Sequence, residues 1–461
     1  MVATIATFNS ILKEFYLGPV QEQLNNEVLV LELMEKASVD WNGRLAHIPV
    51  HLARNAGADF AALAAGAGPA LPAAGQQTWL NYTVNATFLY GRFEVTGPAI
   101  ASAGKGGKNT FIGWMDAEMD YLVKDVRNRS DESVFSGGRM LGFLNERRTQ
   151  VAGNDWEFTG DIAKVEALRA VAAAGTLEVV FVRHDFGNAA AWGFLNDAGG
   201  NPVTPAAVST VTAVDPAAGT ITIGSTGLNT EPVDPGFAIG VYCVDQTVAV
   251  QDIVGDITVA DAEPTGIYGN LGATINGLAA AQVRNHFGID VVANPLLQSN
   301  ILTMAVVAGA GPVQGRAALD LDRMQSAFDT VLVRSDDEPN CIVMHPQTRQ
   351  QYVAILQGVL GANLFTMTNK AEKGDGGFTG LAYGGVPIKT ARHMARGGIA
   401  FLTLGTWKML ELQPGGFADL DGNVLSRVAD QDSWEGFYRW YYNTICMRPN
   451  ANALLVGINL V

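Results

Sequence analysis

Charged side chains are scarce in this 461-residue sequence, in which Asp, Glu, Lys and Arg together make up 16%. Positive charge is the scarcer kind: 30 Lys and Arg stand against 45 Asp and Glu, which gives a formal net charge of −15. A protein that binds nucleic acid electrostatically needs cations to neutralise phosphates. The balance argues against that class. Two explanations fit the low fraction of charged residues: other subunits cover much of the surface, or the chain is simply rich in Gly and Ala.

Cysteines and long apolar runs are also scarce. The three cysteines, Cys243, Cys341 and Cys446, are odd in number and far apart, which predicts a reducing compartment and neither a disulfide framework nor a zinc framework. No segment reaches the ~18 apolar residues of a membrane span. The first 16 residues lack the basic region and apolar core of a targeting signal. We therefore expect no membrane association and a protein that works where it is made.

Complete catalytic motifs are missing as well. The Gly-rich loop from Gly104 to Thr110 is similar to a phosphate-binding loop, whose Gly-Lys pair would be Gly107 and Lys108. That alignment places Asn109 where Ser or Thr must ligate magnesium, and Ser102 where the first Gly belongs. We expect no nucleotide site there.

Histidines and a short acidic run complete the candidates. His47 and His51 share one face of an expected strand, but no third metal ligand is spaced nearby, so ordinary surface histidines are favoured. His345 precedes a helix and could act as a base, yet no nucleophile motif accompanies it. The run from Asp419 to Asn423 starts like a calcium loop, but its Gly comes too early and no Glu closes it, which favours a plain turn. We therefore expect no enzyme activity and no catalytic, cofactor or metal site.

What the sequence does contain is one long helical pattern, from Asn109 to Phe135. Spacings of three and four residues place five apolar side chains on one stripe: Phe111, Met115, Met119, Leu122 and Val126. Asn109 or Thr110 is expected to cap the helix at its start, and Gly137-Gly138 to end it. At ~1.5 Å per residue the helix is about 40 Å long, so it must lie along another part of the molecule.

A two-stranded arm is predicted before this helix. The segments from Trp41 to His51 and from Gln77 to Val95 alternate apolar and polar residues as paired strands do. Between them, the segment from Asn55 to Gly75 consists almost entirely of Ala, Gly and Pro, which suits a pliable tip. An isolated two-stranded arm is marginal in water, so it should lie on a neighbouring surface.

The remaining segments give an α+β pattern, because helices and strands come in runs without strict βαβ alternation. A short helix and a second amphipathic helix, with Val28, Leu31 and Met34 on one face, are expected around a break at Gly18-Pro19. Residues 150–262 read as a small β-barrel or sandwich, interrupted by a helical stretch at 162–174. The later expected elements are a helix over 319–334 with Leu321, Met324, Phe328 and Leu332 on its apolar face, a strand over 340–345, a helix opened by Pro346, strands over 386–389 and 399–404, and C-terminal strands.

The order of these parts resembles the major capsid proteins of tailed double-stranded DNA bacteriophages, which have the Hong Kong 97-type capsid fold. The resemblance rests on the arm, the long helix, the EPTGIYGN turn at Glu263–Asn270, the helix and strand from Leu319 to Leu356, and the MRPNANALLVGI ending. It implies an N-terminal arm (1–40), an E-loop (41–97), a P domain with a spine helix (98–149), an inserted β-rich domain (150–262), an A domain (263–424) and C-terminal strands returning to the P domain (425–461).

The resemblance also implies a structural role. Copies of the chain would self-assemble as hexamers and pentamers into the icosahedral head of a tailed phage, in the cytoplasm of a bacterial host. A separate scaffolding protein, a portal and decoration proteins are the implied partners, with weak non-specific contact to packaged DNA. The alternatives are an encapsulin-type nanocompartment of the same fold, a carbohydrate-binding or adhesion protein suggested by the β-rich segment, and a hydrolase, which lacks a catalytic constellation.

Overall fold

The computed structural model describes a large part of the chain. The described residues are 2–3, 34–37, 39–53, 55, 57–58, 73–98, 108–136, 140–147, 155–158, 177–184, 193–194, 209–215, 220–223, 238–243, 265–273, 285–291, 293–307, 313–315, 318–360, 381–394, 397–418, 425–428, 431–456 and 458. The helices expected near the N-terminus, the helical stretch over 162–174, the arm tip over 59–72 and the run over 419–423 lie outside these residues. Within them, no helix is long and apolar enough to cross a membrane.

The long helix is α4, Lys108–Ser136, and it matches the expected helix closely. It begins at Lys108, so the caps expected at Asn109 and Thr110 are wrong, since both residues lie in its first turn. Met119 and Leu122 pack on the side chains of the neighbouring strand β6, Thr87–Thr96, and Val126 is buried, as the apolar stripe predicts. The side chains of Phe111 and Met115 lie outside the described part of the helix.

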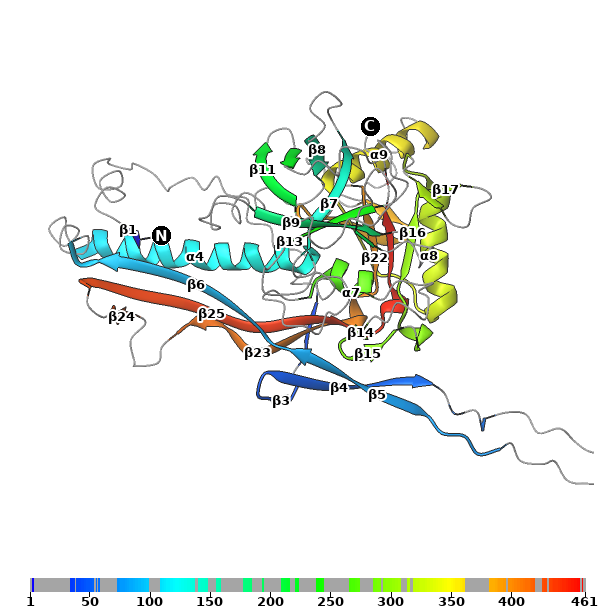
Figure 1. Ribbon diagram of the computed structural model, residues 1–461, viewed down its shortest axis with the longest axis horizontal. Coiled ribbons are helices and arrows are strands. Elements are labelled where there is room, and N and C mark those ends of the chain that lie inside the picture. Colours follow the sequence, from blue (N-terminus) through cyan, green and yellow to red (C-terminus); the bar gives the residue numbers. More distant parts are fainter. Residues whose placement is uncertain are drawn as a thin grey trace, which may run out of the picture.

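A six-stranded sheet lies along this helix (Figure 1). Its strand order is β1 (Val2–Ala3), β6 (Thr87–Thr96), β25 (Ser433–Cys446), β23 (Trp407–Phe417) and β2 (Glu35–Ala37), with β24 (Ser426–Arg427) paired to β25. The two outermost strands of this sheet, β1 and β2, thus both come from the N-terminal segment. Met34 was expected on a helix, but it is buried at a bend directly before β2.

A second six-stranded sheet forms the compact part of the molecule. Its order is β16 (Asn300–Thr303), β26 (Ala453–Val456), β22 (Ile399–Leu402), β19 (Cys341–Met344), β21 (Val386–Thr390) and β20 (Ala382–Tyr383). Strands β19 and β22 are buried along their whole length, which explains their continuous apolar runs. The C-terminal segment therefore contributes to both sheets, because β25 joins the first and β26 the second.

Two helices pack with the second sheet, α8 (Leu321–Ser335) and α9 (Pro346–Leu360). Asp320 caps α8 by accepting a hydrogen bond from the Asp322 amide at 3.2 Å, and Asp336 ends it in the left-handed conformation. The buried face of α8 consists of Met324, Ala327, Val331 and Ser335. Leu332 was expected on that face, but it is 39% exposed, so its assignment is wrong.

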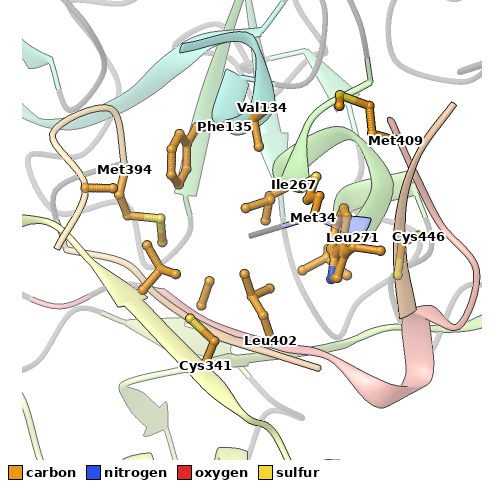
Figure 2. Packing of buried hydrophobic residues seen from close by; sticks show 14 of the residues in the cluster. Met34, Val134, Phe135, Ile267, Leu271, Cys341, Met394, Leu402, Met409 and Cys446 are labelled. Carbon is orange, nitrogen blue, oxygen red and sulfur yellow. The ribbon is translucent and has the colours of Figure 1, made fainter. Parts of the chain in front are cut away.

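The two sheets meet in one apolar cluster near the C-terminal end of α4. Figure 2 shows Val134 and Phe135 of α4 facing Ile267 and Leu271 across this cluster, with side chains of the second sheet beyond. Ile267 and Leu271 belong to α7, Ile267–Ala273, so the turn expected over 263–270 gives way to a helix that starts at Ile267. This cluster holds the long helix, both sheets and α7 together.

A third part is a seven-stranded sheet between α4 and α7 in the sequence. Its order is β10 (Gly193–Phe194), β9 (Leu177–His184), β11 (Ser209–Asp215), β12 (Thr220–Ile223), β8 (Asp155–Phe158), β7 (Met140–Arg147) and β13 (Ala238–Cys243), and β13 pairs back onto β9. That return pairing closes six of the strands into a ring, the arrangement of a small barrel. Strand β7 lies before residue 150, where the β-rich segment was expected to begin.

The arm is a separate three-stranded sheet of β3 (Trp41–Asn42), β4 (Leu45–Ala53) and β5 (Thr78–Asn85), and it projects from the compact part (Figure 1). The second arm strand is shorter than expected: it ends at Asn85, and after Ala86 the chain continues as β6 in the first sheet. The remaining short elements are the paired strands β14 (Asn285–His286) and β15 (Ile289–Asp290), the pair β17 (Ala305–Val307) and β18 (Val313–Gly315), and the 3-10 turns η3 (Pro295–Leu297), η5 (Leu404–Thr406) and η6 (Pro449–Ala451).

Candidate functional site

The arm projects from the compact part of the molecule (Figure 1), and its base is firmly anchored. Four of its side chains are buried, Ala46, Leu52, Tyr82 and Val84. They pack in one cluster with side chains from the compact part and from the first sheet: Phe287, Ile289, Val291, Leu297, Leu410 and Ile445. Burying a large apolar side chain is worth about 1.5–3 kcal/mol, so this cluster fixes the direction in which the arm leaves the molecule.

Backbone hydrogen bonds add to this anchorage. The Thr83 amide donates to the Phe287 carbonyl at 2.8 Å, which ties β5 to the β14–β15 hairpin. The Asn443 side-chain amide donates to the Asn85 carbonyl at 2.6 Å, which ties the end of β5 to β25. These bonds satisfy backbone groups at the point where β5 leaves its partner strand for the first sheet.

The hairpin that holds β5 turns on two residues with positive φ, Phe287 at 49° and Gly288 at 87°. Two such residues define the tight turn that suits a two-residue hairpin. A non-glycine residue in this conformation is uncommon, and Phe287 is held there with its ring buried in the anchoring cluster. Tyr82 of β5 lies edge-on to His286 at a centroid distance of 5.2 Å. The hairpin therefore clasps the base of the arm.

The distal half of the arm, although Leu52 of β4 is buried there, exposes two large apolar side chains of β5. Trp79 is 57% exposed and Leu80 is 40% exposed, although their side chains point to opposite faces of β5. The Trp79 ring lies close to the ring of His51 of β4, at a centroid distance of 4.8 Å. A two-stranded ribbon with large apolar groups exposed on both faces is marginal by itself. These groups therefore suit contact with another surface.

A second exposed aromatic group lies on the face of the first sheet that α4 does not cover. Phe88 is 45% exposed and Tyr90 is 55% exposed, and both contact Tyr441 of β25 through edge-on rings. The hydroxyls of Tyr90 and Tyr441 are 2.8 Å apart, and this hydrogen bond raises the pKa of Tyr90. Further along the same face, Arg92 pairs with Glu435 at 2.7 Å. Exposed aromatic residues beside arginine are typical of protein–protein interfaces.

The histidines singled out in the sequence have local partners. His47 Nδ1 lies 3.3 Å from the Thr83 hydroxyl across the arm, and the ring of His51 stacks near Trp79. His345 Nδ1 accepts a hydrogen bond from the Gln347 amide at 3.2 Å, so it caps α9 at its first turn. No group of three His, Cys, Asp or Glu suited to a metal occurs among the described residues. Lys108 and Asn109 of the Gly-rich loop lie within α4.

Two features of this site were missed in the sequence. The exposed pair Phe88 and Tyr90 belongs to β6 and not to the single arm strand that the sequence predicts. The sequence carries no signal for this change, because apolar side chains continue at even positions from Leu80 to Tyr90, and only the structure shows that burial moves to odd positions from Thr87 onward. The buried His286 gave no signal, because a histidine within a short turn sequence is ordinary.

Comparison with known proteins identifies the fold. The chain has the fold of a chain in the Cyanophage A-1(L) capsid asymmetric unit, with 99% of both chains covered, a TM-score of 0.51 and 10% identity. A chain of Mycobacterium phage Bobi is 11% identical over 98% of both chains, with a TM-score of 0.43. A chain of the holo-SrpI encapsulin complex from Synechococcus elongatus PCC 7942 is 16% identical and matches 35% of this chain and 54% of its own, with a TM-score of 0.24. No protein-family model and no curated protein matches the sequence.

Proposed function

We propose that this protein is the major capsid protein of a tailed bacteriophage, and that many copies form the icosahedral shell around the double-stranded DNA genome. The observation that carries the proposal is the fold shared with a capsid chain over 99% of both lengths. The protein acts through its shape and contacts, without chemistry of its own. Its place is the capsid of the virion, assembled in the cytoplasm of the host.

The division into parts follows the Hong Kong 97-type scheme. The arm is the E-loop, α4 is the spine helix of the P domain, and the second sheet with α8 and α9 is the core of the A domain. In this proposal the shell grows by contacts between two different surface patches on neighbouring copies. Such contacts close the copies into a ring when the rotation between neighbouring copies is a whole fraction of a full turn. The exposed distal half of the arm is one of those patches. A separate scaffolding protein, a portal and decoration proteins are the further partners.

Electron microscopy of the purified full-length chain tests the proposal. We expect closed shells of uniform size when the proposed scaffolding protein is supplied, because every copy carries the same contact surfaces. Shells isolated from infected cells should contain double-stranded DNA. Shells that enclose a protein cargo and no genome would instead support the encapsulin-type alternative, and a chain that stays monomeric at assembly concentrations would contradict both.

The role of the arm is tested by a double variant, Trp79→Ala with Leu80→Ala. Both side chains are exposed in the free chain, so their loss should cost the fold little, within ±0.5 kcal/mol for a typical surface change. We expect a folded subunit with a greatly reduced yield of shells, measured by sedimentation and microscopy. Asn81→Ala is the matched control, because Asn81 is an exposed polar residue on the same strand. Wild-type shell yield from the double variant would remove the arm from the assembly contacts.

A further inference from the structure

His286 occupies an unusual position at the base of the arm. It is the last residue of β14, its side chain is fully buried, and Tyr82 of β5 lies edge-on to its ring. The adjacent residue, Phe287, accepts the backbone hydrogen bond of Thr83 and packs in the cluster that anchors the arm. Any change that moves His286 therefore acts directly on the contact that fixes the arm.

The hydrogen bonds of His286 suit only the neutral ring. Nε2 lies 3.2 Å from the Cys446 carbonyl oxygen, which can only accept, so Nε2 carries the proton. Nδ1 is buried and has no hydrogen-bond partner among the described residues. In the imidazolium form both nitrogens are donors, and the second donor would have no acceptor in that part of the structure. A buried unpaired donor that is also charged is costly.

The groups around the ring do not offset a positive charge. On β5 the facing group is Tyr82, and on β25 it is Cys446; burial raises the pKa of both, that of Cys446 to about 12, so both are neutral near pH 7. Helix α7, which contacts β14, contains no acidic or basic residue. Asp290, on the other strand of the hairpin, directs Oδ1 to the Ala293 amide at 3.3 Å.

Two basic side chains lie further out. His47 on β4 contacts Thr83, the residue after Tyr82. Arg448 follows two residues after Cys446 and pairs with Asp337. Neither basic side chain can offset a positive charge on His286.

We propose that the β14–β15 hairpin is an acid-sensitive latch: protonation of His286 opens the hairpin and releases the base of the arm from the compact part. The released segment is the base of β4 and β5, since Thr83 loses its bond to Phe287 and Tyr82 loses its packing on the ring. This inference concerns the free chain and does not depend on the proposed function as a shell protein.

The direction of the pH dependence follows from burial, which lowers the pKa of His286 from 6.5 to about 4. The open hairpin binds a proton below about pH 6.5, whereas the closed one does so only below about pH 4. Between these values the open form binds more protons, so closure weakens as the pH falls. The equilibrium constant for opening should rise about tenfold per pH unit in this window, and about 300-fold across it.

Hydrogen exchange of the purified, unassembled full-length chain tests the latch, with exchange measured by mass spectrometry at pH 7.5, 6.5, 5.5 and 4.5. Rates are converted to protection factors, which removes the intrinsic pH dependence of exchange. We expect protection over residues 45–53, 78–85 and 285–290 to fall about tenfold per unit below pH 6.5, while residues 341–344 and 399–402 of the second sheet keep theirs. Equal loss in both regions, or no loss in the arm, would overturn the proposal.

Two variants isolate the histidine. His286→Gln keeps a donor for the Cys446 carbonyl but cannot be protonated, so its arm protection should not change between pH 6.5 and 4.5. His47→Gln removes one of the two exposed histidines of β4 and should keep the wild-type pH dependence. A wild-type response in His286→Gln would show that other groups open the arm. If His286→Gln does not fold, the wild-type comparison of protection in the arm with protection in the second sheet still tests the proposal.

Discussion

Among single residues, Gly91 sets how closely the long helix approaches the first sheet. A Cβ atom at this position would lie 2.7 Å from Val126 Cγ2, closer than real Cβ contacts allow, and 3.0 Å from Leu122 Cδ1, which is tighter than most of them. We expect Gly91→Ala to lower the free energy of unfolding by about 1–3 kcal/mol, the usual cost of overpacking a well-packed contact. Denaturant unfolding of the unassembled chain measures it.

Gly416→Ala is the matched control for this change. Gly416 lies in β23 of the same sheet, and a Cβ there would have no atom within 4 Å. The loss of chain entropy is similar for the two substitutions, so the difference between them reports the contact with α4. Equal effects of the two substitutions would mean that α4 does not rest on β6 at this point.

At the scale of elements, the sequence predicts helices better than sheet membership. The starts of the helices α4, α8 and α9 were expected to within two residues. Three- and four-residue spacings of apolar residues mark α4 and α8, and Pro346 marks the first residue of α9. Strand β23 was missed: Met409 and Leu410 are both buried, which breaks the alternation, and Pro414 lies where the register shifts. The pairing of β6 with β25 joins residues more than 300 positions apart, and no local pattern encodes it.

The ring of strands after α4 gives a prediction about deletions. Strand β7 pairs only with β8 and β13 among the described strands, and α4 and α7 on either side contact each other in the apolar cluster. Replacing residues 139–262 by a short Gly/Ser linker should therefore leave a soluble chain with the remaining fold. Replacing only residues 154–260 should give aggregates, because β7 would become an unpaired edge. Solubility measurements and circular dichroism distinguish the two deletion variants. A soluble variant lacking 154–260 together with an insoluble variant lacking 139–262 would contradict the assignment of β7 to the ring of strands.

At the scale of the whole molecule, the scarcity of positive charge bears on contact with DNA. Lys124, Arg127 and Arg129 of α4 form a local basic group in the sequence, and this spacing predicts a single patch. In the structure they do not share one face: at 3.6 residues per turn, Arg129 lies about 140° around the helix from Lys124. Lys124 Nζ also lies over the Tyr121 ring, 5.1 Å from its centroid, and of the three only Arg127 is exposed, whereas Lys124 and Arg129 are partly buried.

A shell protein that bound its genome tightly would hold it against the wall, because each neutralised phosphate releases counterions and strengthens the contact. With a net charge of −15 and a divided basic group, we expect the free chain to bind duplex DNA more weakly than the ~10⁻⁴–10⁻⁶ M typical of non-specific binding proteins at physiological salt. Titration with a labelled duplex at two salt concentrations measures it. Micromolar binding with a steep salt dependence would contradict the expected weak contact. If the double variant Lys124→Gln with Arg127→Gln lost this binding while the control Arg349→Gln on α9 kept it, α4 would be a DNA-anchoring surface.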